Sequence, residues 1–361
     1  MLNSIRDRLL SACECCPQPM TGNGVSRRDV LRAGAAAIAT AGLPSSVFAQ
    51  PRPHRIDVHH HIVPLSWLAA MEVIGRADFP LRSWSIQKTL DDMDKAGIAT
   101  SMTSPTTPQV TPLGQAVAVR VAREANEYAK KMAVDHPGRF GVWAILPLPH
   151  IDESLKEIAY AFDTLKVDGV GCMTSYGDKW LGHAQFAPIW EELNRRKATV
   201  YTHPTNANCC VNVVQGVPDY MMEFGTDTAR TIASVILTGT SQKYKDINWI
   251  WSHGGGGLVA FAERFQVQVV SIPPYKDKIT AEMMNGELRR FYYDTAQISG
   301  AVTLEALSKL VPISQIVYGT DFPYRTGADH TKGVTAFFKG SDLMKVDREN
   351  AMRLIPSLRS A

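Results

Sequence analysis

The stretch RIDVHHHI, residues 55–62, joins a short apolar run to three consecutive histidines. Side chains alternate between the two faces of a β-strand, so His59 and His61 should share one face while His60 takes the other. Two neighbouring imidazoles buried on one face need partners for their nitrogens. A metal ion held by both histidines would meet that need.

Seven further runs of β-branched or apolar residues follow, and they alternate with longer segments of helical period, such as 154–166 and 186–197. The eight runs are 55–62, 97–105, 140–148, 168–176, 198–204, 247–253, 291–296 and 315–323. Strands that alternate with helices form parallel sheets, and eight such units over about 250 residues fit an α/β fold of the (β/α)8 TIM barrel type. An open doubly wound sheet is the alternative architecture.

The first 49 residues differ in character from the rest and predict a twin-arginine export signal. Arg27 and Arg28 precede the uncharged stretch AGAAAIATAGLP, and Val47-Phe48-Ala49 has small residues at the positions that a signal peptidase reads. The apolar stretch is too short to span a bilayer permanently. We therefore assign 1–49 to a cleaved signal and 50–361 to one barrel domain, and expect a periplasmic or secreted protein.

The charge of the chain argues against two classes of partner. Of its 361 residues, 38 are basic and 35 acidic, and five basic and three acidic residues lie before residue 50. The rest of the chain is therefore nearly neutral. This balance suggests neither nucleic acid nor an anionic membrane as a partner.

Three of the six cysteines, Cys172, Cys209 and Cys210, follow the predicted signal. An odd number with two adjacent residues is not a disulfide framework. The three others would not be translated if synthesis began at Met20 rather than Met1. Cys209 and Cys210 could approach the metal as soft ligands, but we expect them to be buried or to pack in a lid.

Polar side chains collect where three of the predicted strands end, and the strand ends carry the active sites of TIM barrels. His59 and His61 end the first run, His203 the fifth and Asp321 the eighth. Three imidazole nitrogens and one carboxylate oxygen suit zinc best, with manganese, iron or cobalt tolerated. The pattern predicts one divalent metal held by these four residues, whereas His60 should face the surrounding helices as a structural residue.

His253 ends the sixth run and is followed by four glycines, residues 254–257. An imidazole at this place can accept a proton from a metal-bound water or hydroxyl. The glycines would let backbone amides approach a ligand closely, although such a run can also be a plain turn.

The sequence allows two interpretations for several large side chains. Those at or just after strand ends either line an aromatic substrate pocket or belong to the core or a lid. They are Trp67, Trp84, Tyr176 and Trp180. Ile189, Trp190 and Leu193 follow a helical period, and we expect them in the core.

These strand ends, in this order, resemble the amidohydrolase superfamily, and more closely its branch related to aminocarboxymuconate-semialdehyde decarboxylase. The chain looks most like the 6-methylsalicylate decarboxylase group. The resemblance covers residues 55–356 and rests on IDVHHHIVP, GRFGVWAILPLP, DGVGCMTSYGDKWLG, PIWEELNRRKATVYTHP, WIWSHGGGG, FYYDTA, YGTDFP and ENAMRLIP. It implies the metal ligands already named, and a His253 that hydrogen-bonds or deprotonates a metal-bound oxygen.

The resemblance also implies that Arg264 contacts the substrate carboxylate, in some members across a dimer interface, and hence a homodimer or larger homo-oligomer. Two departures from the superfamily matter. Binuclear members place a carboxylated lysine or a glutamate at the end of strand four, whereas this chain has GCMTSY at 171–176, with Lys179 beyond it. Several benzoate decarboxylases have glutamate where this chain has His59, which makes the site here more positive.

The leading hypothesis is metal-dependent, non-oxidative decarboxylation of a salicylate-type phenolic acid. The metal would bind the phenolate and one carboxylate oxygen, Arg264 would hold the carboxylate, and Asp321 or His253 would protonate the ring carbon. Tyr176 is a further candidate for substrate contact. Hydrolysis of an amide, lactone or ester by a metal-bound water is the alternative, and an inactive binding or metal-storage protein is the third hypothesis.

Overall fold

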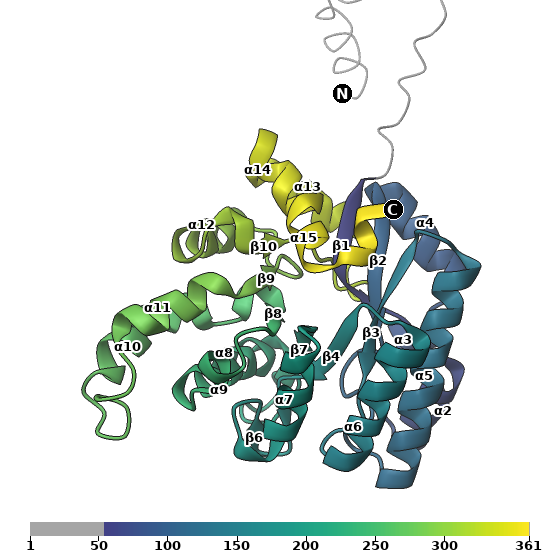
Figure 1. The fold of residues 1–361 in the computed structure, drawn as a ribbon. Coiled ribbons are helices and arrows are strands. Elements are labelled where there is room, and N and C mark those ends of the chain that lie inside the picture. Colours follow the sequence, from purple (N-terminus) through teal and green to yellow (C-terminus); the bar gives the residue numbers. More distant parts are fainter. Residues whose placement is uncertain (1–53, 361) are drawn as a thin grey trace, which may run out of the picture. The chain divides into compact units, whose positions relative to one another are not determined.

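Residues 54–360 are described by a computed structural model, in which eight parallel strands stand inside a ring of helices (Figure 1). Each predicted run contains one strand of this eight-stranded sheet. The strands are β1 (Arg55–His61), β2 (Ile98–Ser104), β3 (Phe140–Ile145), β4 (Gly169–Met173), β7 (Thr199–His203), β8 (Asn248–Trp251), β9 (Tyr292–Asp294) and β10 (Ile316–Val317). A small antiparallel hairpin, β5 (Ser175–Tyr176) and β6 (Lys179–Trp180), follows β4.

The eight strands lie side by side in chain order, as a TIM barrel requires. The chain after β10 returns to β1, where Val58 N donates to Tyr318 O at 2.9 Å and Asp321 N donates to His59 O at 2.8 Å. A bridge between His60 and Phe322 continues this seam. The barrel is therefore nearly closed, and the open doubly wound sheet is excluded.

Helices follow most strands and cover the outside of the barrel. They are α2 (Leu65–Val73), α3 (Phe79–Arg82), α4 (Ile86–Ala96), α5 (Gln115–Asp135), α6 (Ile151–Tyr160), α7 (Ala187–Arg195), α8 (Glu223–Leu237), α9 (Thr240–Lys243), α10 (Leu258–Val269), α11 (Ala281–Arg290), α12 (Ala301–Leu310), α13 (Gly327–Phe337), α14 (Gly340–Met344) and α15 (Asn350–Leu354). Short 3-10 or π turns include Ala161–Leu165, Asn208–Cys210, Asp219–Met221 and His253–Gly255.

The connection from α4 to β2 shows how local sequence sets these boundaries. The Ser85 side chain caps α4 by accepting a hydrogen bond from Lys88 N. Gly97 ends the helix with φ of +67°, a left-handed conformation that favours glycine. The apolar run that begins at Ile98 then enters the sheet as β2.

The barrel core fills the end opposite the functional face. Ile56, Val58, Trp143 and Ile250 belong to one buried cluster that α15 closes. Thr199, the first residue of β7, donates to the carbonyl of Leu354, which fixes α15 at the N-terminal end of the strands. The C-terminal end of the barrel is thus left for polar side chains.

A second apolar cluster lies between the strands and the helices, and it includes Ile189, Trp190 and Leu193, as predicted from their helical period. Within the described part of the chain, no helix is both long and apolar enough to span a membrane. The described residues, 54–360, belong to one compact unit. The predicted export signal, 1–49, lies outside the described residues.

Candidate active site

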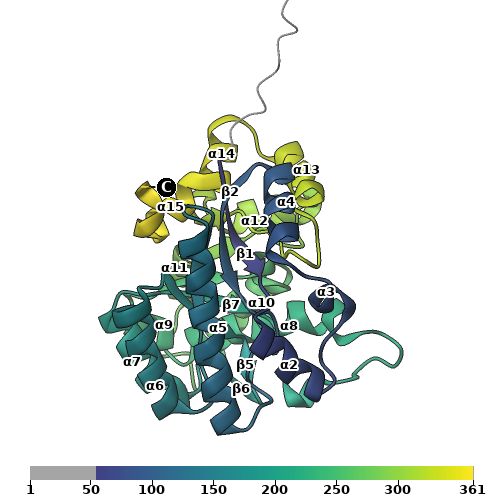
Figure 2. The same cartoon turned by 90° about the vertical axis from the view of Figure 1, so that its right-hand side faces the viewer.

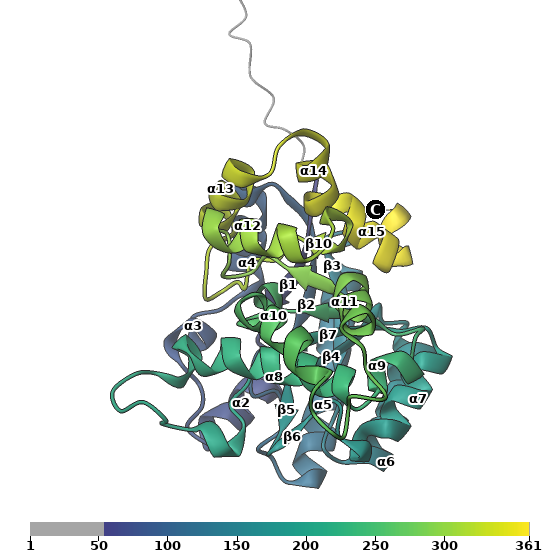
Figure 3. The same ribbon diagram turned by 90° about the vertical axis from the view of Figure 1, so that its left-hand side faces the viewer.

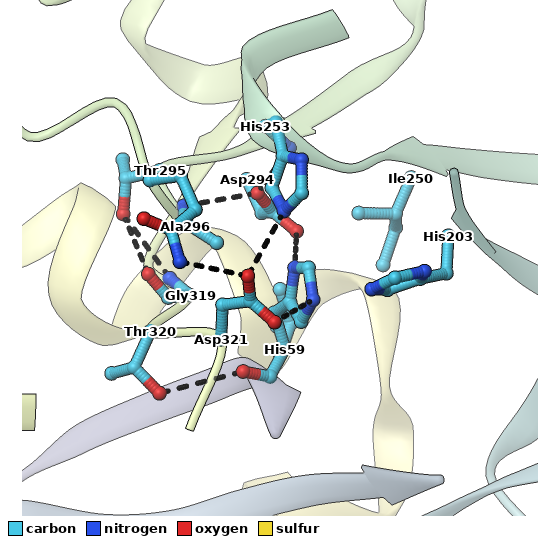
Figure 4. Close-up of polar contacts among 12 residues, drawn as sticks. His59, His203, Ile250, His253, Asp294, Thr295, Ala296, Gly319, Thr320 and Asp321 are labelled. Carbon is cyan, nitrogen blue, oxygen red and sulfur yellow. Dashed lines mark hydrogen bonds and ion pairs between the residues drawn. The ribbon is translucent and has the colours of Figure 1, made fainter. Parts of the chain in front are cut away.

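Four side chains from four strand ends meet at the C-terminal mouth of the barrel (Figure 4). His59 comes from β1, His203 from β7, His253 from just beyond β8 and Asp321 from beyond β10. One nitrogen or oxygen atom of each lies within 4.8 Å of the corresponding atoms of the other three. This spacing is suitable for a single metal ion held by all four.

His61 joins the same group. Its Nε2 atom lies 3.2 Å from His59 Nε2 and 3.1 Å from Asp321 Oδ1, and its ring centroid is 4.7 Å from that of His203. The structure therefore brings together all four residues predicted to bind metal. It adds His253, which the sequence indicated as a proton acceptor. A ring nitrogen of His253 lies close enough to the other ligand atoms to bind the same metal ion.

Oxygen atoms outside the group fix the orientation of three of the imidazoles. His59 Nδ1 donates to Asp294 Oδ2 at 2.8 Å, and His203 Nδ1 donates to the carbonyl of Pro204, also at 2.8 Å. His61 Nδ1 donates to the carbonyl of Ser104 at 3.2 Å. Because these oxygens only accept, each ring keeps its proton on Nδ1 and presents Nε2 as a possible metal ligand.

The charge state of the group suits a cation at its centre. Burial lowers the pKa of His61, and it holds that of His203 well below the ordinary value. At His59, burial is outweighed by Asp294 and Asp321, which raise the pKa to about 10. At Asp321, burial is outweighed by the histidines, chiefly the charge on His59, which hold its pKa well below the usual range. The carboxylates thus favour positive charge here, and a divalent metal would supply it.

One atom of the site has an unmet bonding capacity. His253 Nε2 is buried and has no hydrogen-bond partner within residues 54–360, although Asp321 Oδ2 lies 3.4 Å away. A buried imidazole nitrogen is costly when it has no partner. Together with the nitrogen-rich donor set, this orphaned atom fits a bound divalent metal.

Two of the site residues adopt unusual backbone conformations. The φ angles of His253 and Asp321 are +53° and +70°, in the left-handed region that non-glycine residues rarely occupy. Gly319 lies close by, and a Cβ atom there would stand 2.9 Å from His59 Cβ and 3.1 Å from Asp294 Cβ. The local backbone is thus shaped to aim these side chains inward, as is common at functional sites.

The structure adds two polar residues that the sequence did not single out. Asp294 ends β9, is fully buried, and accepts from His59 Nδ1 and from the backbone N–H of His253. Gln297 is exposed, and its amide donates to Asp321 Oδ2 at 2.9 Å. The sequence carried a signal for Asp294, since FYYDTA places an acidic residue at the end of a predicted strand.

His60 faces away from this group, on the other side of β1. Its Nδ1 donates to Asp57 Oδ2 at 3.0 Å, and its ring stacks on Phe322 with centroids 4.8 Å apart. Asp57 also accepts from the backbone N–H and the hydroxyl of Thr320, at 3.0 and 2.7 Å. These contacts join β1 to the segment that carries Asp321.

Two candidates for substrate contact lie elsewhere in this chain. Tyr176 is buried in the core, where its hydroxyl accepts from Met173 N at 3.0 Å and its ring packs on Phe186. Its contact with a substrate is not tested by this placement and stays a prediction. Arg264 lies on the exposed side of α10 and makes no hydrogen bond or ion pair within residues 54–360. Its contact with a substrate stays a prediction.

The glycine run after His253 is a packed turn rather than a ligand cradle. The backbone N–H of Gly257 donates to the carbonyl of Gly225 at 2.9 Å, and those of Gly255 and Gly256 donate within the turn. A Cβ atom at Gly256 would lie 2.2 Å from the carbonyl oxygen of Gly225. The run therefore lets α8 approach closely, and the backbone N–H groups of Gly255, Gly256 and Gly257 are already hydrogen-bonded.

The remaining sequence candidates occupy structural or surface positions. Trp67 is buried and donates to the carbonyl of Gln109, and Trp180 donates to Asp227. Lys179 is exposed and its Nζ atom donates to Gln185. It is therefore not placed to bridge two metal ions. Cys209 is exposed, so the expectation that it is buried is wrong, whereas a place in a lid stays a prediction.

Known proteins that this chain resembles have the same type of fold or are named as decarboxylases. The family model described as amidohydrolase matches residues 56–356. Decarboxylase macB of Penicillium terrestre is 34% identical over 326 residues, which cover 85% of this chain and 96% of that protein. The 6-methylsalicylic acid decarboxylase acuB of Aspergillus aculeatus is 31% identical over 322 residues, which cover 85% and 97%.

A solved structure shares the fold. The dihydroxybenzoic acid decarboxylase from Polaromonas sp., with bound manganese and the inhibitor 2-nitroresorcinol, superposes with a TM-score of 0.73 at 22% identity. The match covers 83% of this chain and 96% of that one. The family model spans almost the whole barrel, and the curated relatives match over most of their length. This chain therefore belongs to the amidohydrolase family.

Proposed function

We propose that the protein is a metal-dependent, non-oxidative decarboxylase of a salicylate-type phenolic acid. The observation that carries the proposal is the convergence of four imidazoles and Asp321 at the barrel mouth. The strand-four end offers Thr174, not a lysine or glutamate that could bridge a second metal. Relatives named as decarboxylases of 6-methylsalicylic acid support the same reaction class.

The metal would be held by His59, His61, His203 and Asp321, and His253 has a ligand atom within 4.8 Å of those of His59, His203 and Asp321. Zinc fits this donor set best, and manganese, iron or cobalt are alternatives. When bound, such an ion supplies a Lewis-acidic centre for the phenolate and carboxylate oxygens of the substrate. The manganese in the Polaromonas structure makes manganese the first alternative to test.

The side chains around that centre can manage the proton that the reaction needs. Asp321 Oδ2 lies 3.4 Å from His253 Nε2, so a proton can pass between these two groups. One of them delivers it to the ring carbon that bears the carboxylate. The bond from that carbon to the carboxylate then breaks, and its electron pair restores the aromatic ring as CO2 leaves. The amide of Gln297 holds Asp321 in place.

The decisive experiment is a mass-spectrometric screen of hydroxybenzoates with the metal-loaded protein. Loss of CO2 from a salicylate is the expected result, and it should vanish after chelation and in the His253→Ala variant. If no hydroxybenzoate loses CO2, the proposal fails. Gain of water by an ester, lactone or amide would instead identify a hydrolase that uses the same residues.

A homodimer or larger homo-oligomer is part of the proposal. Helix α10 exposes Phe261 and Val267 beside Arg264, and their exposed fractions are 40% and 63%. A second copy could cover these apolar side chains and receive the arginine, whose planar fork suits a carboxylate. Light scattering of the active protein should report more than one chain per particle. A fully active monomer would contradict this part.

Export by the twin-arginine route is the proposed path to the periplasm or outside the cell. Twin-arginine transport carries folded proteins, so a metal loaded in the cytoplasm would stay bound. Replacing Arg27 and Arg28 with lysine together should leave the protein in the cytoplasm. Its recovery in the periplasm despite this change would exclude the route.

A further inference from the structure

The loop between β7 and α8, residues 204–222, carries two adjacent cysteines that the metal site does not use. Part of this loop stands away from the barrel in two views of the molecule (Figures 2 and 3), whereas Thr205 and Cys209 hydrogen-bond to the chain after β4. Cys209 is exposed and Cys210 is half-buried. Their sulfur atoms lie 2.7 Å apart, longer than a disulfide bond of about 2.05 Å, and both are free thiols.

The local backbone holds the pair in this arrangement. The two cysteines end a short 3-10 turn, Asn208–Cys210, in which the backbone N–H of Cys210 donates to the carbonyl of Ala207 at 2.9 Å. The backbone N–H of Cys209 donates to Asp178 Oδ1 at 2.8 Å. The thiols therefore meet because the turn places them together.

We propose that Cys209 and Cys210 are a redox modification site and form a reversible vicinal disulfide. Their peptide bond is trans, so their Cα atoms lie about 3.8 Å apart, below the usual range of about 4.4–6.8 Å for a disulfide. A disulfide under this constraint is strained and is easily reduced. Exposed, strained disulfides of this kind are the labile ones, so the bond can open again when thiols are present.

The oxidant would be a low-molecular-weight disulfide or a protein disulfide. One cysteine thiolate attacks it, forms a mixed disulfide and releases the first thiol. The second cysteine thiolate then attacks the first cysteine's sulfur and releases the second thiol. Two electrons and two protons thereby pass from the pair to the oxidant, which becomes two thiols. An oxidising compartment supplies such disulfides.

The loop connects two segments that lie at the barrel mouth, so a disulfide in the loop would restrict the backbone beside the metal site. The loop begins directly after His203, and it ends at α8, where the ring of Phe224 lies 6.2 Å from the ring of His203. A new covalent ring at Cys209 and Cys210 restricts the backbone between these two fixed ends. The proposal concerns the thiols, so it stands independently of the proposed decarboxylase activity.

Thiol mapping of the metal-loaded protein tests the proposal. The protein is incubated with excess oxidised glutathione, blocked with N-ethylmaleimide, and digested with trypsin, which yields peptide 198–230 with both cysteines and without Cys172. We expect this peptide to lose two hydrogens and to carry no maleimide. Dithiothreitol treatment before blocking should restore two maleimide groups.

Two variants make the test specific. Cys172→Ser should behave as the wild type, because Cys172 is buried elsewhere. Cys210→Ser should instead carry glutathione on Cys209, because its partner is missing. The proposal is overturned if the wild-type peptide keeps two maleimide groups after oxidation, keeps glutathione on either sulfur, or joins a second chain.

Discussion

Three consecutive histidines have separate roles because a strand divides them between two environments. His59 and His61 direct Nε2 toward Asp321, whereas His60 bonds Asp57 and stacks on Phe322. The alternation of side chains made this division predictable from sequence. The partners of each ring were not predictable, because they come from residues far away in the chain.

The division can be tested through metal content. His59→Gln should lower metal affinity by at least tenfold, since it removes a nitrogen ligand and the partner of Asp294. His60→Gln should leave the metal-to-protein ratio unchanged, because its ring lies on the opposite face of β1. Elemental analysis of the two purified variants measures both ratios. Equal loss of metal in the two variants would refute the alternation.

Asp294 orients His59, so its loss should weaken the site without removing a ligand. The Asp294→Asn variant keeps the size of the side chain but removes the charge that holds the Nδ1 proton of His59. Changes of this kind typically lower metal affinity about 10- to 100-fold. A competition titration with a coloured chelator measures the change. Unaltered affinity would show that the backbone alone positions His59.

At the scale of elements, sequence pattern located the strands better than it located their connections. The eight apolar runs became strands because burial on both faces leaves few other places for them. The β5–β6 hairpin escaped prediction, and the sequence left open whether the glycines after His253 approach a ligand or form a turn. Both depend on tertiary neighbours, as the close approach of Gly256 to Gly225 illustrates. The sequence left both a core position and a substrate pocket open for Tyr176, because its packing on Phe186 also depends on a tertiary neighbour.

The packing of helix α13 against the chain after β9 can be tested by pH, because it buries a histidine of α13. His330 is fully buried and contacts the Thr295 hydroxyl at 3.0 Å. Burial lowers the pKa of His330 to about 4 from 6.5. Between pH 4 and 6.5 the unfolded chain therefore binds a proton that the folded chain does not, and stability should rise with pH across this window.

The variant His330→Gln retains a polar partner for Thr295 and removes this titration. The wild type should lose about 3 kcal/mol more unfolding free energy than the variant as the pH falls from 7 to 4. Urea unfolding at several pH values, with the metal-loaded protein, gives both curves. Parallel curves for the two proteins would mean that His330 is protonated equally in the folded and unfolded chains.

For the whole molecule, a metal ion bound at this site would also stabilise the closed barrel. Its ligands come from β1, from β7, and from the segments after β8 and β10, so a bound ion would join the first and last strands across the seam. Binding to the folded state alone stabilises it by about 2.7 kcal/mol when free metal is 100 times its dissociation constant. Chelation should therefore lower the thermal midpoint, and added metal should restore it.

Two variants distinguish stabilisation by an ion at this site from stabilisation by ions bound elsewhere on the protein. His60→Gln should show the same shift as the wild type on chelation, because it retains every ligand. His203→Gln should start from a lower midpoint and respond little to chelator, because it lacks the ligand from β7. Calorimetry of the three proteins with and without chelator makes the comparison. An equal response in His203→Gln and the wild type would place the stabilising ion somewhere else on the molecule.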